Sequence, residues 1–253
     1  MPLRELIARI DEKKAELDRR RPLPPAVVAK LAEYFDVEWT YHSNAIEGSS
    51  LTRQETYLII RHGLTVNGKP LAEHLEAINH QHAIRLVEEL AASDAPLSEH
   101  TIRQIHTLIL RTINDEEAGR YRRIQVYITG SEYVPPGPEA VPPLMHDFGR
   151  WLDSEEAKAL HPLELAALAH FKLVNIHPFV DGNGRTARLL MNLILLRAGY
   201  PPAVIRNEDR LAYYEALEEA RAGRTEALIT LVAQAVERSL DIYLASSSPR
   251  EVA

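Results

Sequence analysis

Apolar side chains recur at helical spacing along most of the chain. Near the amino end, Leu3, Ile7, Ile10 and Leu17 follow a period close to that of an α-helix, which predicts an amphipathic helix there. Proline, serine, threonine and glycine punctuate similar patterns farther on. These patterns predict helices near residues 25–34, 37–48, 52–60, 70–92, 98–113, 209–222 and 225–244.

Two segments are apolar on nearly every side. Residues 162–176 and residues 186–198 each carry leucine, isoleucine, valine or alanine at most positions. A helix that is apolar all round is typical of a protein core. We therefore expect an all-α fold with two buried helices joined by a polar loop over residues 177–185.

One segment has the pattern of a strand. Gln125–Thr129 is followed by Gly130 and Ser131 and then by a run of prolines over residues 135–138. Turn residues beside a short β-prone run predict a short β-hairpin, or flap. Prolines make it a poor central strand, because proline cannot donate to a ladder.

Composition narrows the class of protein. The 253 residues carry a net charge of -7 and no cysteine. An acidic chain is a poor partner for nucleic acid, and without cysteine there is neither a disulfide nor a thiolate nucleophile. The first twenty residues show neither a signal-peptide core nor a spanning segment, so we expect a cytoplasmic protein with no membrane partner.

The loop between the two apolar helices carries the most informative chemistry. Gly182, Asn183 and Gly184 open the second helix, where free backbone N–H groups and the helix dipole favour an anion. Arg185 lies in the first turn and Arg188 three residues later, so both can form forked bonds to further phosphates. This arrangement indicates a polyphosphate site.

Asp181 and His177, which precede the glycines, have side chains that suit catalysis. Asp181 offers the hard oxygen that Mg²⁺ takes when nucleotide phosphates supply its other ligands, and His177 can accept a proton near neutral pH. Each residue alone is more often structural: a buried histidine, a solvated arginine face or an ordinary helix start. In combination they favour phosphate-transfer chemistry.

The stretch from His177 to Arg188 resembles the signature of the Fic family, His-x-Phe-x-(Asp or Glu)-Gly-Asn-Gly-Arg-x-x-Arg, at every defined position. Residues 118–122, 162–171 and 199–201 are similar to the family as well. The resemblance covers about residues 43–244. It implies the Fic fold, a helical bundle with a short β-hairpin flap, organised as an N-terminal helical region (1–95), a catalytic domain (96–246) and a tail (247–253).

The resemblance also implies roles for single residues. His177 would deprotonate a Ser, Thr or Tyr hydroxyl of a target protein for attack on the α-phosphate of ATP, and Asp181 would hold Mg²⁺. The implied ATP-binding residues are Asp181, Gly182, Asn183, Gly184, Arg185, Thr186, Arg188 and Tyr213. The flap would pair with the target's backbone through Ile128, Thr129, Gly130, Ser131, Glu132 and Tyr133. The chain departs from many relatives at Arg221–Arg224, where Asn-x-Gly-Asp is common.

A second motif resembles the inhibitory pattern of the family, (Ser or Thr)-x-x-x-Glu-(Gly or Asn). Here it reads from Ser43 to Glu47 and Gly48. A glutamate beside a glycine is also a common helix ending. Within a Fic protein, a Glu47 carboxylate paired with Arg188 would occupy the guanidinium needed by the γ-phosphate, so the resemblance implies autoinhibition within one chain. Some relatives use the same glutamate to remove AMP, which is a hypothesis here.

The leading interpretation is therefore an autoinhibited protein adenylyltransferase. Its partners would be ATP and a hydroxyl-bearing target protein, and a homodimer is expected from the family. Two alternatives remain open at this point: transfer of a different phosphate-containing group, and an ATP-responsive binding module without catalysis. Kinase-like relatives depart from Gly-Asn-Gly, which disfavours the first. The presence of His177, Asp181 and both arginines disfavours the second.

Overall fold

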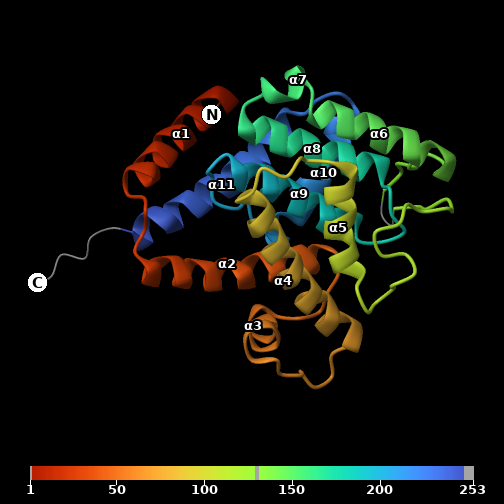
Figure 1. Ribbon diagram of the computed structural model, residues 1–253, viewed down its shortest axis with the longest axis horizontal. Coiled ribbons are helices and arrows are strands. Elements are labelled where there is room, and N and C mark those ends of the chain that lie inside the picture. Colours follow the sequence, from red (N-terminus) through yellow and green to blue (C-terminus); the bar gives the residue numbers. More distant parts are fainter. Residues whose placement is uncertain (1, 129–130, 248–253) are drawn as a thin grey trace, which may run out of the picture.

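The computed structural model describes residues 2–128 and 131–247, and all regular structure within them is helical (Figure 1). This confirms the expected all-α class. The α-helices are α1 (Leu3–Arg19), α2 (Pro25–Ile46), α3 (Arg53–His62), α4 (Leu71–Ala91), α5 (Glu99–Leu110), α6 (Val141–Leu152), α7 (Glu155–Lys158), α8 (Pro162–Ile176), α9 (Asn183–Arg197), α10 (Arg210–Arg221) and α11 (Glu226–Ser246), and 3₁₀ turns span Pro138–Ala140 and Asn207–Asp209.

Helices α8 and α9 form the centre of the molecule, as their apolar sequences predict. Helix α9 packs against α8, α4 and α5, and its leucines from Leu189 to Leu195 are buried. The large core cluster joins residues of both ends of the chain, including Leu6 and Ile10 of α1 and Leu240 of α11. The α9 amino terminus is thus held in a rigid frame.

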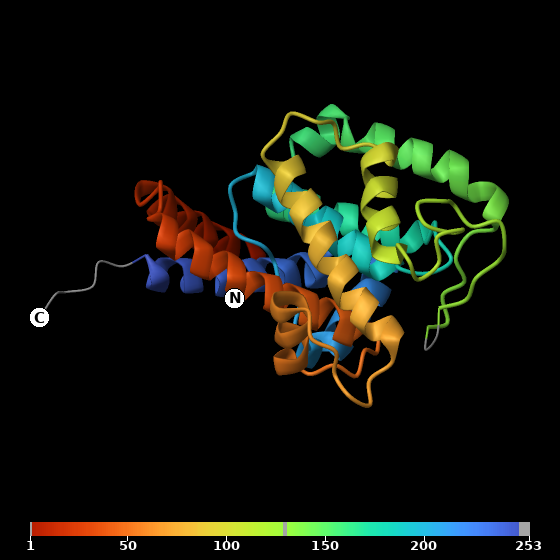
Figure 2. The same cartoon turned by 60° about the horizontal axis from the view of Figure 1, so that its bottom comes forward.

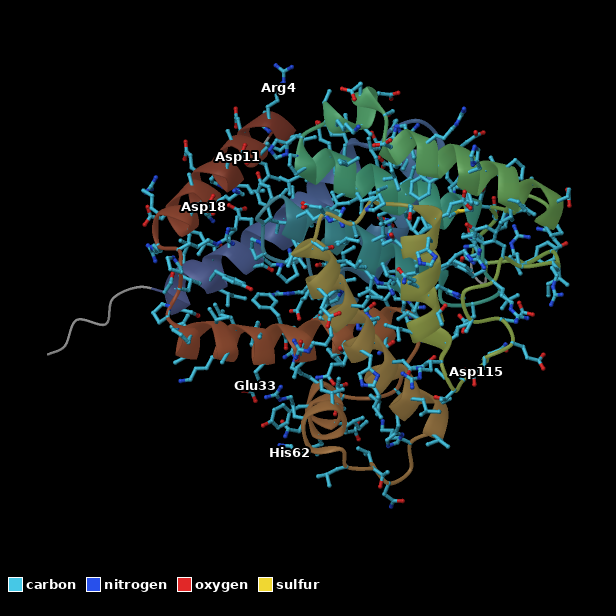
Figure 3. All side chains as sticks on the ribbon, in the orientation of Figure 1. Arg4, Asp11, Asp18, Glu33, His62 and Asp115 are labelled. Atoms are coloured by element: carbon cyan, nitrogen blue, oxygen red, sulfur yellow. The ribbon has the colours of Figure 1, made fainter. Side chains whose placement is uncertain are left out.

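Helix α1 lies along α11, and both extend with α2 from one side of the bundle (Figure 2). Charged side chains of α1 such as Arg4 and Asp18 point away from the body (Figure 3). None of the helices in residues 2–128 and 131–247 has the length and apolar character needed to cross a bilayer.

Helix α2 differs from the expectation of two separate helices. It runs without interruption for 22 residues, because neither glycine nor proline occurs between Pro25 and Gly48. Its second half is buried from Phe35 to Ile46 except at Tyr41. Helix α6 was not predicted, since its sequence begins Val141-Pro-Pro; prolines fit the first turn, where their missing N–H is not needed.

The expected hairpin is not seen as strands in the described residues of 123–137. The Gln125 side chain links its two arms instead. The Gln125 amide donates to the carbonyls of Val126 and Pro135, at 3.0 Å each. Since proline has no N–H, the second arm has fewer donors for a ladder. Thr129 and Gly130 lie outside the described residues.

Candidate active site

The loop between α8 and α9 is shaped by its own residues. His177 ends α8 in a left-handed conformation, with φ of 52°. Phe179 is fully buried and stacks on His106, with ring centroids 3.6 Å apart. The Asn183 side chain accepts from the Phe179 N–H and donates to its carbonyl, both at 2.9 Å. These contacts fix the loop before α9 begins.

Steric constraints explain why glycine occurs at positions 182 and 184. Gly182 caps α9 with φ of 73°, a conformation that side chains rarely adopt. At Gly184 a Cβ would lie 2.2 Å from Oε1 of Glu47. Glycine at this position therefore opens the space above the first turn of α9, and a carboxylate fills that space. The Glu47 carboxylate thus lies against the first turn of α9, where the sequence predicts an anion site.

Arg188 is the centre of a buried contact network. Its side chain is 3% exposed, and its Nη2 lies 2.7 Å from Oε1 of Glu47. Ser43 accepts twice from the same guanidinium, through Oγ from Nε at 3.0 Å and through its carbonyl from Nη2 at 2.8 Å. Nη1 has no hydrogen-bond partner among the described residues. Ser43 and Glu47, the first and last defined polar residues of the inhibitory pattern, thus both contact Arg188 of α9.

Electrostatics favour this ion pair. Burial is the largest single effect on Arg188 and lowers its pKa, but Glu47 and Tyr213 together raise it by more, so the net pKa is raised. Tyr213 lies beside the guanidinium and is 2% exposed, with its hydroxyl 3.0 Å from Nε2 of His170. Burial raises the pKa of Tyr213 to about 12. Tyr213 therefore packs behind Arg188 in this state, and it does not line an open nucleoside pocket.

The His177 imidazole is held in its neutral form. Burial is the main cause that lowers its pKa to about 4, and Arg122 and Arg221 act in the same direction. Its Nδ1 lies 3.3 Å from the carbonyl of Val174. Since that carbonyl can only accept, Nδ1 carries the proton and Nε2 is left as the acceptor.

Arg185 and Asp181 also meet. Nη2 of Arg185 lies 3.2 Å from Oδ2 of Asp181, and Nη1 lies 2.9 Å from Oε1 of Glu76 on α4. The other Asp181 oxygen accepts from the N–H of Gly182 at 2.6 Å. Thr186 is fully buried, and its hydroxyl has no partner among the described residues.

Asp181 is the residue that the sequence predicts as the metal ligand. The Asp181 side chain is 66% exposed, and the described residues contain no cluster of three or more histidine, cysteine or acidic side chains suited to a metal ion. Zinc-like sites need such clusters. Mg²⁺ needs no such cluster when nucleotide phosphates and water complete its shell, so the donor set fits Mg²⁺ carried with ATP.

The flap residues that follow the undescribed pair are anchored to α8 and α10. Ser131 donates to Oε1 of Glu218 at 2.8 Å, and the Tyr133 hydroxyl donates to the Asn175 carbonyl at 2.8 Å. The Arg221 guanidinium lies over the Tyr133 ring, 4.3 Å from its centroid. Ile128 precedes the undescribed pair, and Glu132 is exposed. Arg221, a departure from the family pattern, thus belongs to the flap anchor.

Three site residues were missed by sequence reasoning. Buried Arg122 donates to the carbonyls of His177, Ile124 and Pro136, so it joins the catalytic loop to the flap base. His106 contacts the Asp181 carbonyl at 2.9 Å. Glu76 pairs with Arg185, as given above. Arg122 stands in the Ala118–Arg122 stretch that resembles Fic proteins, whereas no local pattern marks His106 or Glu76.

A separate cavity of about 630 Å³ lies between α2, α3 and the segment before α10, and its lining includes Lys30, Tyr34, Arg53 and Arg206. None of the catalytic-loop residues lines it. The space over Gly184 is instead occupied by the Glu47 carboxylate.

Comparisons with known proteins show which family the chain resembles. The Fic/DOC family model matches residues 96–195. A Nematostella vectensis protein named protein adenylyltransferase Fic is 44% identical over 247 residues, which cover 96% of this chain and 57% of that protein. Drosophila melanogaster has a protein of the same name, 39% identical, with 51% of its length covered. The chain thus spans little more than half of the length of these relatives.

Solved structures match over nearly the whole chain. A Fic domain containing signaling protein from Bacteroides thetaiotaomicron is 30% identical, with a TM-score of 0.88, and the match covers 94% of this chain and 97% of that chain. Fic-1 from C. elegans is 33% identical, with a TM-score of 0.87 and coverage of 96% and 72%. With the loop, the fold and these matches in agreement, this chain is a member of the Fic/DOC family.

Proposed function

We propose that this chain is an autoinhibited protein adenylyltransferase, which transfers AMP from ATP to a Ser, Thr or Tyr hydroxyl of another protein. One observation carries the proposal: the Glu47 carboxylate lies on Arg188 and directly over Gly184. An acidic group at this place marks where a phosphate would bind, because both need the same guanidinium and the same helix terminus. The names of the relatives support the same chemistry.

In the proposed AMP transfer, each residue of the His177–Arg188 stretch has one role. Nε2 of His177 accepts the proton of the target hydroxyl, and the hydroxyl oxygen attacks the α-phosphorus. The bond to the β-phosphate oxygen breaks, and pyrophosphate leaves. The first-turn amides of α9 with Arg185 and Arg188 would stabilise the phosphate charge that develops. Mg²⁺ held by Asp181 would supply further positive charge there.

We propose that the flap positions the target. Its described part carries exposed apolar side chains, with Ile124 62%, Tyr127 75% and Val134 56% exposed. An extended segment with free backbone groups can accept another chain as an added strand. Arg122 binds carbonyls at both ends of the flap and the carbonyl of His177, which would hold such a target beside the base.

The position of the label in ATP tests the reaction class. We expect Glu47→Gly with Mg²⁺ and a protein acceptor to incorporate label from α-labelled ATP and none from γ-labelled ATP, because AMP keeps the α-phosphate. Incorporation is followed by gel autoradiography in parallel reactions of equal specific activity. Label from the γ position would identify phosphate transfer and exclude adenylylation.

A further inference from the structure

A glutamate from outside the matched family region contacts the catalytic loop. Glu76 belongs to α4, which precedes residues 96–195. Its Oε1 accepts from Nη1 of Arg185 at 2.9 Å. Helix α4 packs along α9 in the bundle (Figure 1), so the contact joins two rigid elements. Its place is therefore set by the fold and not by a loop.

Arg185 is one buried cation shared by two carboxylates. Its side chain is 3% exposed, while Glu76 is 23% and Asp181 is 66% exposed. A buried guanidinium without a compensating anion is strongly destabilising. Glu76 is the closer and better shielded partner, since Asp181 lies at 3.2 Å and faces solvent. Glu76 therefore compensates most of the Arg185 charge.

The pairing of Glu76 with Arg185 affects whether Asp181 can bind a metal ion. A carboxylate that must neutralise a buried arginine is less available to a cation. With Glu76 in place, Asp181 can leave the Arg185 contact and the guanidinium still keeps an anionic partner. Without the Glu76 charge, Asp181 would be the one carboxylate within ion-pair distance of Arg185 among the described residues.

We propose that Glu76 is a positioning residue for the nucleotide site. It holds Nη1 of Arg185 from the α4 side, directs Nη2 toward the mouth of α9, and so leaves Asp181 free to bind the divalent cation that accompanies ATP. The inference rests on the proposed function, because it assigns Asp181 to the cation. It makes the N-terminal helical region part of the phosphate site.

Calorimetric titration of ATP separates this role from a purely structural one. Glu47→Gly is titrated with ATP in Mg²⁺ and again in EDTA, and the ratio of the two affinities gives the gain due to Mg²⁺. Adding Glu76→Gln should reduce this gain by about tenfold, since charge-assisted pairing then holds Asp181 on Arg185. The affinity in EDTA should stay similar. Glu89→Gln, an exposed position on the same helix, is the matched control and should keep the full gain.

The possible results distinguish the positioning role of Glu76 from the proposed function. If Glu47→Gly binds ATP with a Mg²⁺ gain and Glu76→Gln keeps all of it, the positioning role is overturned while the proposed function stands. If Glu47→Gly binds no ATP under either condition, both fall together. Glu76→Asp guards against misfolding: it keeps the charge on a shorter side chain, and it should recover part of the gain that Glu76→Gln loses. Equal losses in both variants would contradict the electrostatic role.

Discussion

Glycine in place of Glu47 is expected to raise AMP transfer about ten- to a hundredfold, the range of a typical coupling between two competing sites. The reason is local, because the Glu47 carboxylate lies 2.7 Å from Nη2 of Arg188 and fills the space over Gly184. Its removal frees the guanidinium and the helix mouth for phosphate. The measurement is the initial rate of label transfer from α-labelled ATP to a protein acceptor.

Two variants control this prediction. Glu116→Gly changes an exposed glutamate in the turn after α5 and should leave the rate at the wild-type level. Glu47→Gln keeps the shape of the side chain without its charge, so an intermediate rate is expected. An unchanged rate in Glu47→Gly would show that the ion pair with Arg188 does not limit nucleotide binding.

Loss of His177 should have the second large effect. In the Glu47→Gly background, His177→Ala is expected to lower the rate by about a hundredfold or more, the usual contribution of a general base. The affinity for ATP should change little, because the imidazole is not one of the proposed phosphate-binding groups and its Nδ1 lies near the Val174 carbonyl. Transfer is measured with label, and binding by calorimetry.

The backbone of His177 calls for a second variant. Its φ of 52° is left-handed, and asparagine tolerates that conformation better than alanine does. His177→Asn should therefore be as inactive as His177→Ala and more stable. His82→Ala, at an exposed position of α4, should retain activity. Substantial transfer by His177→Asn would exclude this imidazole as the base.

The pH profile gives an independent reading of the same residue. Because burial lowers the pKa of His177 to about 4, the folded protein keeps the imidazole neutral throughout the usual assay range. The lowered pKa means that the base is lost only as the pH falls toward 4. Rates of Glu47→Gly at saturating ATP should therefore be nearly flat from about pH 6 to about pH 8. A midpoint near the ordinary histidine value, about 6.5, would contradict this environment.

Local patterns predicted the parts of the site that are contiguous in sequence. The apolar runs located α8 and α9, and the residues from His177 to Arg188 between them form one loop and one helix start. The backbone amide cradle at Gly182–Gly184 stays a prediction from the same stretch. These features depend on neighbours a few residues away, so one sequence is sufficient to predict them.

Contacts over long sequence separations could not be predicted in the same way. Glu47 and Arg188 are 141 residues apart, and the resemblance to the Fic family, not periodicity, indicated their pairing. Glu76 and Arg122 had no such motif, although each contacts the loop directly. The predicted hairpin was wrong for a related reason. The sequence pattern predicts backbone hydrogen bonds between two strands, whereas the structure has side-chain bonds from Gln125, which no local pattern indicates.

The central claim is that Glu47 occupies the place of the ATP phosphates at the start of α9. A crystal structure of Glu47→Gly with Mg²⁺ and a non-hydrolysable ATP analogue tests it most directly. We expect phosphate oxygens bound to Arg188 and to first-turn amides of α9, with the α-phosphorus facing Nε2 of His177. Phosphates bound elsewhere, with Arg188 still held by Ser43 alone, would contradict it.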